Sequence, residues 1–479
     1  MDGLEFSEIM LSDQLFVARL DSEFYSKKNL FLQEKLKVAG AYPMKEYGAT
    51  LDCSAFYPSI TGYYSHNKKQ IPFLRVNEIH NGLIYITNDT VFLPERVLKE
   101  NSKTIALAYP GDIIIAKGGN TLAKVGLVTD EFPYYATCRD VIILRTKNLT
   151  KLNKYYLWAF LHCSYGQGIL WRSASQTGQP HLTLPSILEI RIPDIINISQ
   201  NIEQLYKNSV VQKHNAEELY EVAQKTLLDA LHFTQSILSE SGTTEKHLSE
   251  SLGTSGRLDA EYYHPKFDDL FSILSKQVTK PLGQLVNIMK SVEPGSEYYG
   301  EEGIPFIRVS DVNVMGIDDP SIKIFPENIP FIEKLFLKKD TIIFSKDGSV
   351  GIAYKLEDDR QAVTSSALLH LNVKNVEEVT PDYLTLVLNS KIVQLQAERD
   401  ASGAIIQHWK PSDIANVIIP IIPYDIQLEI TKKIQESFSL RRKAERLIQL
   451  AVRSVEIAIE QGEEAATKWL ADNAEKLEM

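Results

Sequence analysis

Two stretches of this chain carry the same short motifs in the same order. The clearest pairs are Arg19–Tyr25 with Arg257–Tyr263, and Ile71–Val76 with Ile304–Val309. Further pairs follow in order: Asp112 with Asp340, Tyr156 with Tyr383, His181 with His408, Pro193 with Pro420, and Gln200 with Gln427. A repeat of this length predicts two copies of one domain, and two similar domains can face a two-part target with pseudo-two-fold symmetry.

Length and composition indicate a globular protein with more than one core. The chain has 479 residues, of which 44% are apolar, and no apolar run approaches the roughly 20 residues of a membrane span. The amino-terminal residues do not have the pattern of a signal peptide. Cys53, Cys138 and Cys163 lack CxxC spacing, so we expect free thiols in a cytoplasmic protein without a zinc site.

The net charge of -11 argues against an evenly basic surface for nucleic acid. The charge is unevenly distributed, since residues 61–150 contain 11 Lys and Arg against 8 Asp and Glu, whereas residues 301–400 contain 11 against 17. Any contact with nucleic acid is therefore expected to come from local basic patches or from a more basic partner.

Each copy is predicted to contain a strand-rich region and then a long helix. Short β-branched runs bounded by Gly, Asn, Asp and Pro predict the strands, and segments 153–162 and 381–388 predict short helices. The fold class is α+β, with two similar mixed domains that are each followed by a long helix. The predicted boundaries are a first domain at 1–196, a first helix at 197–240, a linker at 241–256, a second domain at 257–423, and a second helix with an acidic tail at 424–479.

The two long helices are predicted from a seam with alternating steps of four and three residues. The first, from about 199 to 238, has the seam Ile202, Tyr206, Ser209, Lys213, Ala216, Tyr220, Ala223, Leu227 and Ala230. The second, from about 424 to beyond 459, has the seam Ile430, Ile434, Phe438, Arg441, Ala444, Ile448, Ala451 and Val455. This spacing favours a coiled coil, and the alternative is an ordinary amphipathic surface helix.

Motifs of the common enzyme classes are missing from the sequence. It contains no P-loop, no GxGxxG after a strand, no HExxH, no GxSxG and no Pro-Pro dipeptide of the kind that amino-methyltransferases use. Gly118 and Gly119 predict a tight turn that Gly348 matches in the second copy. His181 and His408 have no second ligand at metal spacing. The chain is therefore expected not to be an enzyme.

Polar side chains on loops beside strands are the candidate DNA-binding residues. Arg and Gln can read guanine and adenine edges, whereas Lys, Ser and Thr anchor phosphates. The candidates are Lys68, Lys69, Lys117, Lys124, Arg139, Gln176, Gln179 and His181 in the first copy, and Ser345, Lys346, Arg360, Thr364, Ser365, Gln407, His408 and Lys410 in the second. The alternative for each of them is ordinary solvated surface. Arg75 and Arg308 lie inside matched strands, and a structural salt bridge is predicted for both.

The doubled motifs resemble the DNA specificity subunit of type I restriction–modification systems. The resemblance is carried by the RLDxEYY-like and IPFxRV segments, by the strands at Asp112 and Asp340, and by Ile419-Pro420-Ile421-Ile422-Pro423 ahead of Gln427-Leu428-Glu429-Ile430. The first copy departs from this pattern, because Ile192-Pro193-Asp194-Ile195 lacks the second proline. The resemblance covers nearly the whole chain.

The resemblance implies that each globule is a target-recognition domain for one half of a split double-stranded DNA site. The long helices would pair as an antiparallel coiled coil, set the distance between the domains, and dock two methyltransferase subunits, with restriction or translocating subunits as further partners. The chain would need no cofactor itself, since S-adenosylmethionine, ATP and Mg²⁺ would be bound by partner subunits. The alternatives are a specificity-like subunit of another DNA modification or defence complex, and a cytoplasmic coiled-coil scaffold whose globules bind protein.

Overall fold

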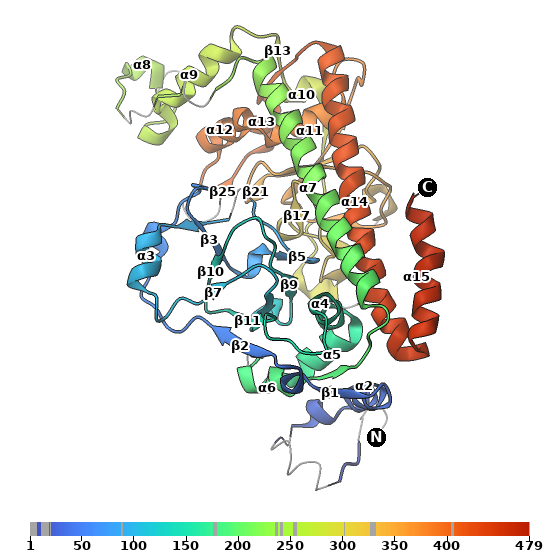
Figure 1. Ribbon diagram of the computed structural model, residues 1–479. Helices are drawn as coiled ribbons and strands as arrows, with labels where there is room; N and C mark the ends of the chain where they lie inside the picture. Colours follow the sequence, from blue (N-terminus) through green and yellow to red (C-terminus); the bar gives the residue numbers. More distant parts are fainter. Residues whose placement is uncertain are drawn as a thin grey trace. The chain divides into compact units, whose positions relative to one another are not determined.

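The computed structural model describes residues 7–10, 19, 21–87, 90–175, 180–234, 238–239, 243–251, 256–300, 302–325, 332–403 and 407–478. The chain forms two compact units, whose elements are labelled in Figure 1. Unit 1 contains Met1–Lys213 and Arg442–Met479, and unit 2 contains His214–Arg441. Each unit therefore includes one part of each long helix.

The strand-rich part of unit 1 is built on two sheets. The larger has the strand order β2-β11-β8-β9-β5-β4, and the smaller has the order β6-β3-β10-β7. The strands are β1 Ala41–Pro43, β2 Thr50–Cys53, β3 Ile71–Leu74, β4 Ile79–His80, β5 Gly82–Ile84, β6 Phe92–Leu93, β7 Leu107–Ala108, β8 Ile113–Ala116, β9 Val125–Leu127, β10 Tyr135–Thr137, β11 Val141–Arg145 and β12 Arg191–Pro193. The helices are α2 Lys27–Val38, α3 Glu95–Glu100, α4 Lys154–His162, α5 Ser164–Ser173 and α6 Leu184–Leu188.

The central strands β8 and β11 are apolar except for the terminal Arg145 of β11, because both of their faces are buried. On one face, Ile113, Ile115, Ile142 and Leu144 join a core with helix α4. On the other, Ile114, Ala116, Val141 and Ile143 join a core with strands β3 and β10 of the smaller sheet. The larger sheet is therefore the middle layer, between a helical layer and a second sheet.

Unit 2 repeats this arrangement. Its order β14-β24-β20-β22 corresponds to β2-β11-β8-β9, and the parallel pair β16 and β23 corresponds to β3 and β10. The strands are β13 Thr279–Pro281, β14 Val286–Lys290, β15 Tyr299–Gly300, β16 Ile304–Ile307, β17 Val312–Asn313, β18 Gly316–Ile317, β19 Lys323–Ile324, β20 Ile342–Ser345, β21 Asp347–Gly348, β22 Ala353–Lys355, β23 Val363–Thr364, β24 Leu368–Val373, β25 Gln407–His408 and β26 Ile418–Pro420. The helices are α8 Leu248–Glu250, α9 Pro265–Leu274, α10 Leu282–Leu285, α11 Pro381–Asn389, α12 Lys391–Asp400 and α13 Pro411–Ala415. The predicted fold class is confirmed, as are the two predicted short helices, here α4 and α11.

The register of the repeat corrects one predicted pair. Ile113 is the Cα partner of Leu144 in unit 1, and Ile342 is the Cα partner of Leu371 in unit 2. The position equivalent to Asp112 is therefore Thr341, one residue later than the Asp340 that the motif alignment matched to it. The residue that Asp340 does match is Gly111, and the two share a positive φ, 63° and 89°. Aspartate is one of the few residues besides glycine that visits this backbone region.

The RLDxEYY-like motif attaches the start of each domain to a later helix. Arg19 forms an ion pair with Asp21 at 2.6 Å, and its guanidinium carbon lies 4.5 Å from the centre of the Phe24 ring. Arg172 of α5 lies over the same ring at 3.7 Å, so one aromatic ring accepts two cation–π contacts. Unit 2 repeats the arrangement with Arg257, Asp259, Tyr262 and Arg399. The motif is therefore structural in both copies.

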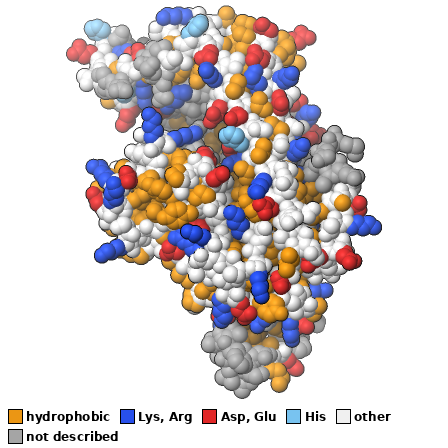
Figure 2. All heavy atoms as spheres, viewed as in Figure 1, with side chains coloured by type: hydrophobic (Ala, Val, Ile, Leu, Met, Phe, Trp, Pro, Cys, Tyr) orange, Lys and Arg blue, Asp and Glu red, His pale blue; other side chains and the backbone are white. Residues whose placement is uncertain are grey.

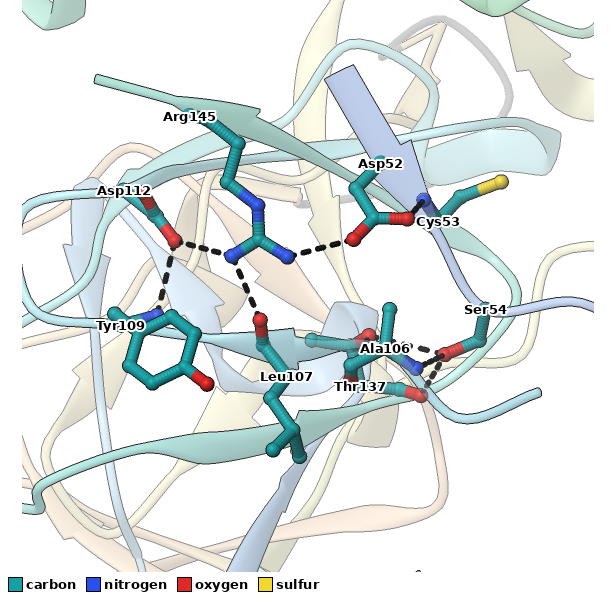
Figure 3. Close-up of polar contacts among 9 residues, drawn as sticks. All are labelled: Asp52, Cys53, Ser54, Ala106, Leu107, Tyr109, Asp112, Thr137 and Arg145. Atoms are coloured by element: carbon teal, nitrogen blue, oxygen red, sulfur yellow. Dashed lines mark hydrogen bonds and ion pairs between the residues drawn. The ribbon is translucent and has the colours of Figure 1, made fainter. Parts of the chain in front are cut away.

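Figure 3 shows a charged network at the edge of the larger sheet of unit 1. Arg145 contacts Asp112 and Asp52 at 2.7 Å each, and its Nη1 also donates to the carbonyl oxygen of Leu107 at 2.7 Å. Strand register places neutral residues at the three equivalent positions of unit 2, Asn372, Thr341 and Met289. The predicted salt bridges of Arg75 and Arg308 are confirmed, with Glu78 at 2.9 Å and Asp311 at 3.8 Å.

The two long helices are α7 Ser199–Ala230 and α14 Tyr424–Gln461, and α15 Glu463–Glu478 follows. In unit 1, Ile202 near the start of α7 shares a core with Val455 near the end of α14. In unit 2, Leu227 near the end of α7 shares a core with Ile430 near the start of α14. The helices therefore pack antiparallel, as Figure 1 also shows. The predicted seam is confirmed, because its apolar members are buried, apart from the partly buried Ala230.

Two buried serines interrupt the apolar seam. Ser437 Oγ of α14 donates a hydrogen bond to the backbone carbonyl oxygen of Ala216 in α7 at 2.6 Å. Ser209 of α7 is also completely buried. Small side chains at these positions allow close approach of the helix backbones, and the Ser437 bond fixes the register of α14 against α7 in unit 2.

The first long helix ends earlier than predicted, at Ala230 rather than near residue 238. His232 has a φ of 50°, and the backbone N–H of Phe233 donates to the carbonyl oxygen of Leu228 at 2.9 Å. This left-handed turn closes the helix end without a glycine. It allows Phe233, only 4% exposed, to turn back into the core of unit 2. Tertiary burial therefore overrides the local helical pattern.

Candidate nucleic-acid interface

An open cleft of about 690 Å³ lies in unit 1, where the loops after β2, β8 and β10 meet the loop before α6. Its charged and ionisable lining consists of Lys117, Arg139, Asp140 and His181. The other residues that line it are Cys53, Ser54, Ala55, Phe56, Val76, Gly118, Gly119 and Thr121. Three predicted binding residues, Lys117, Arg139 and His181, are therefore brought together.

Backbone hydrogen bonds hold these loops in place. The N–H of Lys117 donates to the carbonyl oxygen of Asp140, and the N–H of Leu182 donates to that of Lys117, both at 2.8 Å. Gly118 leaves space for the imidazole, because a Cβ there would lie 2.2 Å from Nδ1 of His181. The place of His181 therefore leaves no room for a side chain at position 118 unless the imidazole shifts.

Unit 2 has an equivalent site with different side chains. The N–H of Lys346 donates to the carbonyl oxygen of Ala367 at 2.9 Å, and the N–H of Trp409 donates to that of Lys346 at 2.8 Å. These bonds repeat those of Lys117 and make His408 the counterpart of His181. Asp347 stands where unit 1 has Gly118, and its Oδ1 lies 2.8 Å from Nδ1 of His408. The predicted turn is confirmed, because Gly119 and Gly348 occupy equivalent positions with φ values of 69° and 77°.

The two equivalent sites differ in charge. Lys346 forms an ion pair with Asp347, so its charge is compensated within the site. Across the part of the chain that the structure describes, Lys117 and Arg139 make no ion pair. The site in unit 1 therefore has two cations outside ion pairs beside one carboxylate, Asp140. In unit 2 the cation is paired with Asp347, and Glu293 adds a second carboxylate. On the face shown in Figure 2, acidic and basic side chains are intermixed, so no wide area of that face carries charge of a single sign.

The other predicted binding residues divide into three groups. The exposed ones are Lys68, Lys69, Lys124, Arg360, Gln407 and Lys410. Ser345, Thr364 and Ser365 are buried. Ser345 Oγ donates to the carbonyl oxygen of Ser349 at 2.6 Å, and Thr364 Oγ1 lies 2.8 Å from Nε2 of His370, so these hydroxyls make internal bonds. Gln176 and Gln179 lie outside the described residues.

Three residues at the equivalent sites were not among the predicted candidates. They are Phe56 in unit 1, which is 76% exposed, and Glu293 and Ser366 in unit 2. The Oε2 of Glu293 accepts hydrogen bonds from the N–H of Ser366 at 3.2 Å and from its Oγ at 2.7 Å. Phe56 lies under Arg139, whose guanidinium carbon is 5.8 Å from the ring centre. The sequence signal available for the first of these was the pair of aromatic residues Phe56-Tyr57 ahead of Pro58.

A comparison with known families identifies one segment of the chain. Residues 275–449 match a family model described as "Type I restriction modification DNA specificity domain". The matched segment covers the strand-rich part of unit 2 and the first part of α14, and unit 1 repeats its strand order and loop positions. Residues 275–449 therefore form a type I restriction–modification DNA specificity domain.

Solved structures similar to this chain have low sequence identity to it. The S subunit from M. genitalium is 15% identical, with 91% of this chain and 95% of that chain covered at a TM-score of 0.34. The HsdS subunit from Thermoanaerobacter tengcongensis is 13% identical, with 87% and 97% covered at 0.27. Because these TM-scores are below 0.5, the assignment rests on the family model. No curated protein matches the chain.

The described part of the chain has little that suggests metal or thiol chemistry. No group of three or more His, Cys, Asp or Glu side chains in the described ranges could hold a metal ion. Burial raises the pKa of Cys138 to about 11 and that of Cys163 to about 12, so both thiols stay protonated at neutral pH. Among the helices described, none is long and apolar enough to cross a membrane.

Proposed function

We propose that the chain recognises a split double-stranded DNA site, with one strand-rich domain on each half-site. The observation that supports this most directly is the pair of equivalent sites at Lys117 and Lys346, which share a backbone scaffold and differ in side chains. Equivalent scaffolds with different chemistry suit two domains that read different sequences, because base edges are read by individual side chains.

The domain boundaries follow from this proposal. Residues 1–196 and 257–423 form the two target-recognition domains, residues 241–256 form a linker, and 197–240 and 424–479 contain the two spacer helices with the acidic tail. At about 1.5 Å per residue, the 32 residues of α7 and the 38 residues of α14 are about 48 and 57 Å long. Paired helices of this length would set the length of the unread spacer between the half-sites.

The same proposal assigns the chemistry to other chains. Two methyltransferase subunits would dock on the paired helices and bind S-adenosylmethionine, and a restriction or translocating subunit would bind ATP and Mg²⁺. The specificity subunit would act in the cytoplasm, where the DNA and these partners are found. The net charge of -11 is tolerable in such a complex, since basic partners share the DNA contact.

Selection from a random DNA library tests the split site. The full chain, reconstituted with its methyltransferase subunits, is expected to enrich two short conserved half-sites separated by a spacer of constant length. Enrichment of one continuous motif, or of no motif, would refute the proposal and favour a protein-binding scaffold.

A deletion of one heptad from each long helix tests the ruler role. Each deletion shortens its helix by about 10 Å, or about three base pairs of B-DNA at 3.4 Å each. The expected result is a shorter preferred spacer with unchanged half-sites. An unchanged spacer would show that the helices do not set it.

A further inference from the structure

One pair of equivalent positions differs completely in chemistry between the two domains. Ser54 Oγ donates to the carbonyl oxygen of Thr137 at 2.6 Å, and Ser291 Oγ donates to that of Thr364 at 2.6 Å. The matched strand pairs place Thr137 beside Leu74 and Thr364 beside Ile307. These anchors define one register for both domains, independent of any sequence alignment.

The residues that lie two positions after each of these anchor residues differ between the two domains. Phe56 and Arg139 follow Ser54 and Thr137, whereas Glu293 and Ser366 follow their counterparts in unit 2. In unit 1 the two side chains form a cation–π contact, with 5.8 Å between the guanidinium carbon and the ring centre. In unit 2 the Glu293 carboxylate accepts two hydrogen bonds, from the backbone N–H of Ser366 at 3.2 Å and from its Oγ at 2.7 Å. Both members differ together, so each domain keeps an internally matched pair.

The pair in unit 1 presents hydrogen-bond donors. Arg139 is exposed and lines the cleft, and its guanidinium carries five N–H donors and no acceptor. The Phe56 ring supports the guanidinium from one side without using any of these donors. Such a group suits the O6 and N7 acceptors of guanine, which it can bind through two parallel bonds.

The pair in unit 2 presents an acceptor. Both hydrogen bonds from Ser366 go to Oε2 of the exposed Glu293, and Oε1 accepts none from any residue in the described ranges. An ionised carboxylate can only accept, and phosphates repel it. It is therefore compatible with bound DNA where it meets a base amine, and the N4 amine of cytosine is the major-groove donor that Asp and Glu read.

We infer that these positions determine base specificity. One domain reads hydrogen-bond acceptors on a base, and the other reads a hydrogen-bond donor. The Phe56–Arg139 pair selects guanine in one half-site, and the Glu293–Ser366 pair selects cytosine in the other. This inference rests on the proposed split-site function.

Exchanging the pairs is the direct test. Phe56→Glu with Arg139→Ser gives unit 1 the chemistry of unit 2, and Glu293→Phe with Ser366→Arg does the reverse. In random-site selection with the full complex, the first exchange is expected to change guanine to cytosine at one position of one half-site. The second is expected to change cytosine to guanine in the other half-site. Loss of a good base contact corresponds to about 5- to 150-fold in preference.

A matched control is available in unit 1. Arg96 lies over Tyr63 at 5.4 Å, and both residues are exposed and lie outside the cleft lining. Tyr63→Glu with Arg96→Ser makes the same chemical change away from the proposed site, and it is expected to leave both half-sites unchanged. A control that alters the motif as strongly as the exchange would overturn the inference.

Single conservative changes cover the case in which an exchanged chain does not fold. Arg139→Lys keeps the positive charge but loses the paired donors, so guanine preference is expected to fall while overall DNA affinity stays. Glu293→Gln keeps the shape and adds a donor, so cytosine preference is expected to broaden. If these variants select the same motifs as the wild type, the inference is refuted. The proposed function would still stand in that case, provided that the wild type selects a split motif. A wild type that selects no split motif would refute both.

Discussion

Acidification should destabilise unit 2 through one buried imidazole. His370 lies on β24 and is 6% exposed, and its burial lowers its pKa to about 4. The ordinary pKa of histidine in an unfolded chain is about 6.5. Between these two values the unfolded state takes up a proton that the folded state does not, so stability decreases as the pH falls through this window. The difference of about 2.5 pKa units corresponds to about 3 kcal/mol at 1.36 kcal/mol per unit.

The substitution His370→Gln separates this contribution from other titrating groups. Glutamine can still hydrogen-bond Thr364 Oγ1, which lies 2.8 Å from Nε2 of the histidine, but it carries no titratable proton. His370→Ile is a second control, since strand register places the buried Ile143 at the equivalent position of unit 1.

Hydrogen exchange of β20 and β24 amides, followed by mass spectrometry, reports the opening of unit 2 separately from unit 1. The free energy of opening should fall by about 3 kcal/mol more in the wild type than in His370→Gln between pH 7 and pH 4. Equal losses in both proteins would show that the imidazole is not held neutral by burial.

Three further predictions concern packing, charge and recognition. Ser437→Ala removes the hydrogen bond between α14 and α7, and urea unfolding should show a loss of about 1 kcal/mol; no change would mean that this bond does not contribute. Arg145→Gln leaves two carboxylates unpaired and should lower the free energy of unfolding by about 3 kcal/mol in the same assay. The control Arg453→Gln, at an exposed arginine, should lower it by under about 1 kcal/mol. Equal losses in the two variants would contradict a stabilising role of the Arg145 network. Replacing Gln176 and Gln179 should alter one selected half-site, and equal loss at both would count against separate readers.

The repeated fold and its helices could be predicted because they depend on patterns within short windows. Central strands such as β8 and β11 are apolar on both faces, and the helix seam has residues such as Ile202 and Leu227 at regular spacing. Burial of these residues is the main contribution to folding, so the sequence pattern and the core coincide.

The exact register of the repeat could not be predicted, because the offset between the copies changes at each loop. Asp112 and Asp340 share a residue type and differ in position, since Gly111 is the structural counterpart of Asp340. Phe56 and Glu293 share a position and differ in type, so no motif search pairs them. Only hydrogen-bond and strand partners across the fold identify such equivalences, and these contacts are distant in sequence.

The division of the long helices between the two units has a consequence for biosynthesis. The core of unit 1 includes Leu447, Val455 and Leu470, and Glu463 accepts a hydrogen bond from the N–H of Asn197 at 2.5 Å. The ribosome therefore releases the amino-terminal domain long before the residues that complete its core exist. Unit 2 has all of its own residues once position 441 is made, so the later domain in the gene is the earlier one to mature. A truncated transcript would leave the first domain permanently unfinished and open to proteolysis.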